Sequence, residues 1–219
     1  MSNDVWSNRA DAYRTSATHA QDADLDTVVE MCNPVAGRKI IDVATGGGHV
    51  ARRLREHGAE VVTCDPAPGM QADVLCFAED IPFADGSFDV AVTRIAAHHF
   101  SAIGKAVGEL ARVSSRVVVV EDTLYASEDV EAAEKLRDPT HVRSYSEEEW
   151  RELLESAGLE VERVEFFRKT HDLADWLART GCEGADAERV RELLADHTSE
   201  DSATWTDTKI LIQARKSQR

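Results

Sequence analysis

Apolar and polar positions change their spacing repeatedly along the chain after residue 38. Short apolar runs rich in valine and isoleucine alternate with stretches in which apolar residues recur every three or four positions. The first pattern predicts buried strands and the second predicts amphipathic helices. The strand candidates are 39–43, 60–64, 74–77, 88–93, 116–121, 160–168 and 208–215, and the helix candidates are 22–32, 48–57, 101–112, 127–137, 146–157, 170–180 and 185–197.

Local signals mark the ends of two of these helices. Ser146 stands three residues before Glu149, the spacing of a capping box, and Gly158 follows the last apolar position. Thr170 and Gly181 bracket the next helix in the same way. The alternation of strands and helices predicts an α/β fold, a mostly parallel sheet covered on both faces. Neither a repeat nor a linker interrupts the pattern, so we predict one domain over 1–219.

The stretch "IIDVATGGGHVARRL" (40–54) predicts a strand, a tight turn and a helix. It holds Gly46, Gly48 and Ala51 in the G-x-G-x-x-A spacing of a dinucleotide-binding turn, and Asp65 follows where an acid would bind a ribose. Backbone N–H groups and the helix dipole make such a turn a ligand site. Asp42, however, would oppose a pyrophosphate and suits a cationic ammonium group, which S-adenosylmethionine carries.

Further segments extend this pattern along nearly the whole chain. They are "YRTSATHAQDADL", "AEDIPFADGSFDVAVTRIAAHHF", "ELARV", "VVVVEDTLY", "RDPTHVRSYSEEEWRELLESAGLEVE" and "KTHDLADWL", in that order. Together with "DVATGGGHVA" they resemble the class I S-adenosylmethionine-dependent methyltransferases, in the small-molecule branch near the ubiquinone/menaquinone-biosynthesis C-methyltransferases. The resemblance implies a Rossmann-like, seven-stranded sheet of order 3-2-1-4-5-7-6, with an N-terminal helical lid (1–37) on an α/β core (38–219).

The same resemblance assigns the cofactor site. Asp42 and the backbone after it would hold the methionine end, Asp65 the ribose hydroxyls, Ala78 and Glu79 the adenine edge, and Arg94 would lie beside the methionine. Asp65 as a plain turn acid and Arg94 as an exposed strand-end residue stay open as alternatives. The full set of implied cofactor-binding residues is Tyr13, Asp42, Ala44, Thr45, Gly46, Gly47, Gly48, Asp65, Ala78, Glu79 and Arg94.

The acceptor side needs few groups, because methyl transfer is an in-line displacement that requires alignment and, for a weakly acidic acceptor, a base. The catalytic candidates are His19 in the lid, and Arg94, His98 and His99 after the fourth strand. Since His98 and His99 are adjacent, we expect one to face the cleft, and we favour His98. The alternative for each of them is a packed or capping histidine.

Two further acceptor-side residues lie in one loop. His141 and Arg143 could close over an anionic acceptor, or could stitch their loop together through hydrogen bonds to carboxylates. Trp176 fits the core spacing of its helix.

One segment departs from the family pattern. Phe77 stands where relatives place an acid for the adenine amino group, and the preceding "MQADVLCF" is short. The adenine wall should therefore be shorter and more apolar. This departure motivates one alternative function, that of a non-catalytic protein that retains the fold. The glycine turn leaves open a second alternative, a nicotinamide-dependent oxidoreductase.

Composition narrows the partners. The net charge of -16 repels polyanions, which excludes nucleic acid as a favoured partner. The four cysteines lack metal-ligand spacing, so we expect buried thiols and no metal. The chain shows neither a membrane-spanning run nor a signal peptide, which predicts a cytoplasmic protein. The prediction is methyl transfer from S-adenosylmethionine to carbon or oxygen of a small organic acceptor; a homodimer stays open.

Overall fold

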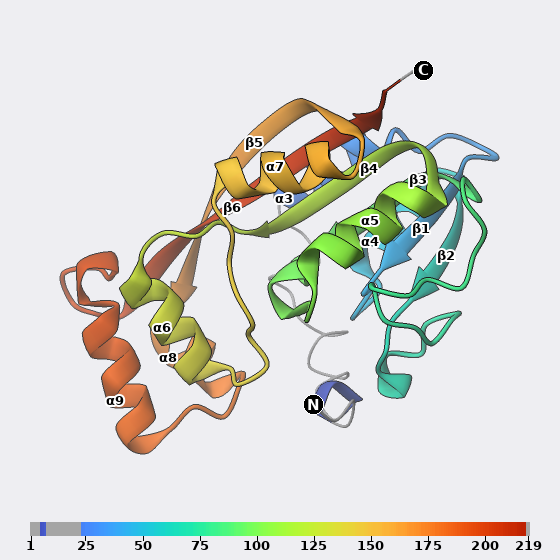
Figure 1. Ribbon diagram of the computed structural model, residues 1–219. Coiled ribbons are helices and arrows are strands. Elements are labelled where there is room, and N and C mark those ends of the chain that lie inside the picture. The colour runs from blue at the N-terminus through green and yellow to red at the C-terminus, as the bar shows by residue number, and fades with distance from the viewer. Residues whose placement is uncertain (1–4, 8–22, 218–219) are drawn as a thin grey trace.

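A mixed sheet forms the centre of the molecule. The computed structural model describes residues 5–7 and 23–217. Among them are six strands in the order β2-β1-β3-β4-β6-β5 (Figure 1). The first four strands are parallel, and β6 runs antiparallel to both β4 and β5. Their bounds are β1 Lys39–Val43, β2 Glu60–Cys64, β3 Phe88–Arg94, β4 Ser114–Thr123, β5 Leu159–Asp172 and β6 Thr204–Lys216.

The predicted strand 74–77 does not form, so the prediction of seven strands is wrong. Only Val74 pairs with the sheet, through one parallel bridge to Cys64. The Asp73 carboxylate accepts hydrogen bonds from the Thr63 amide and hydroxyl, and Leu75 and Phe77 are 58% and 55% exposed. The segment has β-forming residues but nothing covers them, and β-propensity acts mainly through such packing. The remaining strands keep the predicted order.

Helices cover both faces of the sheet, as predicted. On one face, α3 (Ala23–Cys32) and α4 (His49–Glu56) pack against β1, β3 and β4. On the other face, α5 (Ile103–Val113) and α7 (Glu147–Ser156) bury their apolar stripes in the larger core cluster. The parallel strands are therefore buried from both sides, which explains their continuous runs of valine and isoleucine.

A helical lobe surrounds the far end of the β5–β6 hairpin, and the sequence did not predict it as a separate group. The hairpin stays paired as far as Asp172 and Thr204, whereas β4 ends at Thr123, opposite Lys209. Around the extension lie α6 (Glu128–Arg137), α8 (Leu173–Ala178) and α9 (Gly184–Leu193) (Figure 1). They share a core cluster of their own that includes Trp176 and Trp205. We call this group the hairpin lobe.

The predicted helix ends are partly confirmed. Ser146 and Glu149 form the reciprocal capping box of α7, and Gly158 follows the helix with φ +78°. Thr170, in contrast, lies inside β5, and Asp172 caps the short α8 by accepting from the Asp175 amide. The predicted helix 185–197 is α9 followed by a separate 3-10 turn, η3 (Ala195–His197).

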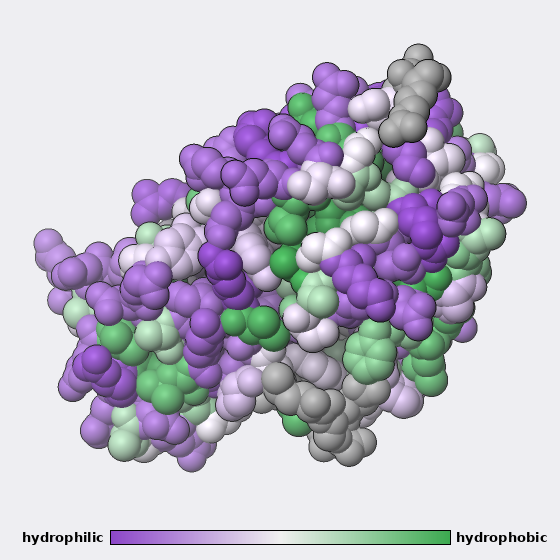
Figure 2. Space-filling view, viewed as in Figure 1, coloured by the Kyte–Doolittle hydropathy of each residue, from purple (hydrophilic) through white to green (hydrophobic). Residues whose placement is uncertain are grey.

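Polar side chains dominate the exterior. Hydrophilic residues cover most of the face in Figure 2, in keeping with the net charge of -16. No helix in 5–7 or 23–217 has the length and apolar content needed to cross a bilayer.

Candidate active site

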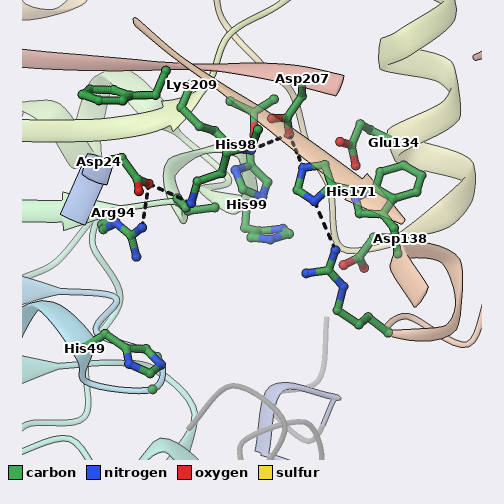
Figure 3. A pocket seen from close by; sticks show the side chains of 18 of the residues that line it. Asp24, His49, Arg94, His98, His99, Glu134, Asp138, His171, Asp207 and Lys209 are labelled. Carbon is green, nitrogen blue, oxygen red and sulfur yellow. Dashed lines mark hydrogen bonds and ion pairs between the residues drawn. The ribbon is translucent and has the colours of Figure 1, made fainter. Parts of the chain in front are cut away.

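A cavity of about 490 Å³ opens at the carboxyl ends of β1, β3 and β4. The glycine turn after β1 lines one side of it, and α6, α8 and the β5–β6 hairpin line the other (Figure 3). His98 and His99 lie between the two sides. This is the edge of an open α/β sheet at which ligands are expected to bind.

The glycine turn leaves room for a ligand beside a buried acid. Gly46 and Gly48 have φ +51° and +71°, and a Cβ built on either would meet no atom within 4 Å. Asp42 is 2% exposed and lines the cavity, and its Oδ2 accepts from the Thr45 hydroxyl (2.6 Å) and the Ala51 amide (3.2 Å). Burial raises the pKa of Asp42 to about 6. Among the described residues Asp42 has no ion-pair partner, so this site fits a ligand ammonium group.

Asp65 stabilises the same turn by accepting hydrogen bonds from backbone amides. Its Oδ2 accepts from the Gly46 amide (3.1 Å) and its Oδ1 from the Ala67 amide (2.9 Å). Burial raises the pKa of this carboxyl above its ordinary value, although the two amides act in the opposite direction. Asp65 does not line the cavity, so its role toward the ribose stays a prediction beside its role in the turn.

The predicted adenine-edge residues lie outside the cavity lining. Ala78 is part of the larger core cluster, and Glu79 Oε1 accepts from the Ser101 hydroxyl and the Ala102 amide, just before α5 begins. Their adenine contacts therefore stay predictions.

Trp6, which the sequence did not single out, joins this region from the N-terminal segment. It packs against Ala67 and Met70, and its ring centroid is 4.5 Å from that of His99. Ser7 accepts from the Gly69 amide. Tyr13 and His19 lie outside the described residues.

Arg94 lies in a buried ion-pair network, and the alternative of an exposed strand-end arginine is wrong. Its side chain is 5% exposed; Nε donates to Glu121 Oε2 (2.6 Å) and Nη2 to Asp24 Oδ2 (2.7 Å). Lys169 Nζ also reaches Asp24 Oδ2, at 2.7 Å. Burial raises the pKa of Glu121 to about 8. Burial also opposes ionisation of Asp24, but the Glu121 hydrogen bond and the nearby Arg94 and Lys169 hold its pKa below the ordinary value.

His98 is held by a carboxylate from a distant part of the sequence. Asp122, at the end of β4, accepts from the His98 amide (2.6 Å) and lies 2.5 Å from Nδ1. Burial alone would raise the pKa of Asp122, but His98 holds it below its ordinary value. An ionised carboxylate only accepts, so Nδ1 carries the proton and Nε2 of a neutral His98 has a lone pair. Nε2 has no hydrogen-bond partner among the described residues.

His99 also lines the cavity, so the expectation that only one of the two histidines faces the cleft is wrong. Both belong to a 3-10 turn, η2 (Ala97–His99), which follows β3 in the chain. Nδ1 of His99 donates to the Thr140 carbonyl (3.0 Å). Burial lowers the pKa of His99 to about 3, so it stays neutral.

The loop of His141 and Arg143 is held together by carboxylates. His141 lines the cavity, but its Nε2 is 3.2 Å from Glu131 Oε1 in a buried pair. Arg143 does not line the cavity; it pairs with Glu149, and half of its side chain is exposed. The structure therefore favours the stitched-loop interpretation over closure on an anionic acceptor.

The fold, the glycine turn and the acid inside β1 define a class I S-adenosylmethionine-dependent methyltransferase. Consistently, the chain belongs to the methyltransferase domain family, whose model matches residues 17–164. It is similar to the uncharacterized methyltransferase YcgJ of Bacillus subtilis (29% identity over 92% of this chain and 88% of the relative). The crystal structure of YcgJ superposes with a TM-score of 0.80, covering 89% and 98% of the two chains at 24% identity.

Similarity to quinone-modifying enzymes is more limited. A demethylmenaquinone methyltransferase of Thermus thermophilus is 37% identical over 42% of this chain and 51% of its own length. The enzyme is thus an S-adenosylmethionine-dependent methyltransferase, and the alternative of a nicotinamide-dependent oxidoreductase is wrong.

Proposed function

We propose that this enzyme methylates a small organic acceptor at oxygen or carbon, with His98 as general base. The observation that carries the proposal is the His98–Asp122 pair. Asp122 accepts one hydrogen bond from Nδ1 of the ring and one from the His98 backbone amide, so that Nε2 of this cavity-lining histidine is left for an acceptor proton. A positioned base of this kind typically contributes about 10²–10⁴-fold to a rate.

The glycine turn supports the binding of the methyl donor. S-adenosylmethionine supplies a methyl group on a sulfonium; the acceptor atom bonds to that carbon while the carbon–sulfur bond breaks and sulfur keeps the electron pair. Asp42 would hold the ammonium end, and Arg94 lines the neighbouring part of the cavity. His98 takes the acceptor proton. Alignment by these fixed groups is the main catalytic contribution expected for such a displacement.

The size of the cavity limits the acceptor. About 490 Å³ is toward the lower end of the range for ligand sites, about 300–1,000 Å³, and this space has to hold both the donor and the acceptor. The acidic exterior is unfavourable for nucleic acid. Both observations favour a small molecule.

A labelled-methyl assay tests this proposal. The enzyme is incubated with methyl-labelled S-adenosylmethionine and separate pools of phenols, enolisable ketones, tRNA and protein. We expect label in a small-molecule pool, in a product that contains a new methoxy or carbon-bound methyl group. Label that enters only tRNA or protein would contradict the proposal.

A further inference from the structure

The hairpin lobe contributes a charged wall to the cavity that the proposed methyl transfer does not use. Asp207 and Lys209 on β6 and His171 on β5 form its centre (Figure 3). Arg137 on α6 and Trp176 on α8 line the same side of the cavity. This wall lies opposite the glycine turn. Because the glycine turn would hold the methyl donor, the acceptor would have to bind on the side of the wall.

Lys209 presents a buried ammonium group at this wall. Its side chain is 6% exposed, and Nζ donates to Thr123 Oγ1 (2.6 Å) and Asp207 Oδ2 (2.7 Å). Burial disfavours its charge, but Asp207 keeps the pKa of Lys209 above the ordinary value. An ammonium group has three donors. Two of them are engaged within the described part of the chain, so one is left for a ligand in the cavity.

Asp207 presents an acceptor at the same place. Its side chain is 5% exposed, and Oδ2 is engaged by Lys209 and by His171 Nε2 (3.2 Å). Oδ1 is buried and has no hydrogen-bond partner among the described residues. Burial opposes its charge, yet Lys209 and His171 hold the pKa of Asp207 below the ordinary value. A buried carboxylate oxygen without a partner is costly, so a ligand donor there would be favourable.

One functional group satisfies both atoms. A hydroxyl accepts a hydrogen bond and donates one from a single oxygen, and Oδ1 and Nζ belong to one contacting pair. A ligand carboxylate would be repelled by the negative charge of Asp207, and a ligand ammonium group would be repelled by the positive charge of Lys209. An ether oxygen could accept but not donate. We propose that the Asp207–Lys209 pair binds a hydroxyl group of the methyl acceptor, and that the acceptor is a hydroxylated small molecule.

The rest of the wall disfavours an apolar chain. Arg137 Nη1 pairs with Glu134 Oε2 (3.1 Å), and the Arg137 guanidinium carbon lies 3.9 Å from the centre of the Trp176 ring. Arg137 Nε is buried and has no hydrogen-bond partner among the described residues. An isoprenoid tail placed here would bury charged groups without replacing their hydrogen bonds. The acceptor therefore differs in kind from a polyprenyl quinone.

This inference rests on the proposed function, and a binding experiment separates the two. The protein, alone and loaded with S-adenosylhomocysteine, is titrated calorimetrically with resorcinol, resorcinol dimethyl ether, myo-inositol and menadione. Resorcinol and myo-inositol distinguish a phenolic from a polyol source of the hydroxyl, and menadione represents a quinone ring. Asp207→Asn and Lys209→Met are compared with Asp201→Asn in an exposed turn and Lys216→Met at the other end of β6.

We expect resorcinol or myo-inositol to bind at least about tenfold more tightly than the dimethyl ether and menadione. Asp207→Asn and Lys209→Met should each weaken that binding about tenfold, while both control variants and the affinity for S-adenosylhomocysteine stay within about twofold. Equal binding of the dimethyl ether or menadione, or full affinity in both pocket variants, would overturn the inference. Should a pocket variant fail to fold, the wild-type comparison still decides. Loss of S-adenosylhomocysteine binding alone would count against the proposed function and not against the hydroxyl site.

Discussion

Replacing Asp42 by Asn should stabilise the empty enzyme and weaken its binding of the methyl donor. Burial raises the pKa of Asp42 from 3.8 to about 6, so ionisation of this carboxyl is disfavoured in the folded state. The folded state binds the Asp42 proton more strongly than the unfolded state, so the contribution of Asp42 to the stability of the wild type falls as pH rises from about 4 to 6. A shift of about two units corresponds to about 3 kcal/mol, which is an upper estimate of the gain at pH 7.

The affinity for S-adenosylmethionine should change in the opposite direction. Loss of a charge-assisted hydrogen bond to the ammonium group costs about 1.5–3 kcal/mol, or roughly 10–100-fold in affinity. The wild type has to release the Asp42 proton in order to form that pair. Its affinity at pH 5 should therefore be about tenfold lower than at pH 7, and Asp42→Asn should remove most of this dependence.

Two measurements check both directions. Urea denaturation at pH 4 and pH 7 gives the free energy of unfolding, and calorimetric titration at pH 5 and pH 7 gives the affinity. Asp186→Asn at the exposed start of α9 is the matched control and should change neither. A variant that is less stable than wild type at pH 7, or that binds S-adenosylmethionine as tightly as wild type, would refute the reasoning.

Three other substitutions give independent tests. Asp65→Ala should lower S-adenosylmethionine affinity by roughly tenfold or more in calorimetry, because it removes the brace of the Gly46 amide as well as any ribose contact; unchanged affinity would argue against both roles. In urea denaturation, the free energy of unfolding of His99→Gln relative to wild type should be about 2 kcal/mol higher at pH 5 than at pH 7. The reason is that folded His99, with its pKa near 3, cannot take the proton that the unfolded chain binds below about 6.5. Parallel pH profiles of the two proteins would contradict the burial of His99 as a neutral ring. Ser146→Ala should cost about 1 kcal/mol in thermal melting through loss of the α7 cap.

Local patterns in the sequence were enough for much of the fold and for one side of the site. The glycine turn, the acid at Asp42 and the capping box of α7 each depend on residues close together in the chain, so their spacing is visible without the structure. Residues 74–77 look like a strand for the same local reason. They fail to become one because strand formation also needs packing partners, which spacing does not report.

The other side of the site depends on contacts between distant segments. Asp122 meets His98 across 24 positions, and Asp24 meets Arg94 across 70. The hairpin lobe likewise exists because β5 and β6 continue past the end of β4. The sequence contained a weak signal for Asp122, a charged pair closing an otherwise apolar strand, but nothing in its spacing identified the partner.

The most direct test of the account is the single-turnover rate of methyl transfer by His98→Gln. The rate is measured at saturating S-adenosylmethionine on the first acceptor identified in the labelled-methyl assay, with His99→Gln as the matched control. If His98 is the base, the rate for His98→Gln is about 10²–10⁴-fold below wild type, with S-adenosylhomocysteine affinity within about twofold of wild type. For His99→Gln we expect a loss of less than about tenfold. A His98→Gln variant that transfers the methyl group at the wild-type rate would contradict the assignment of His98 as the base.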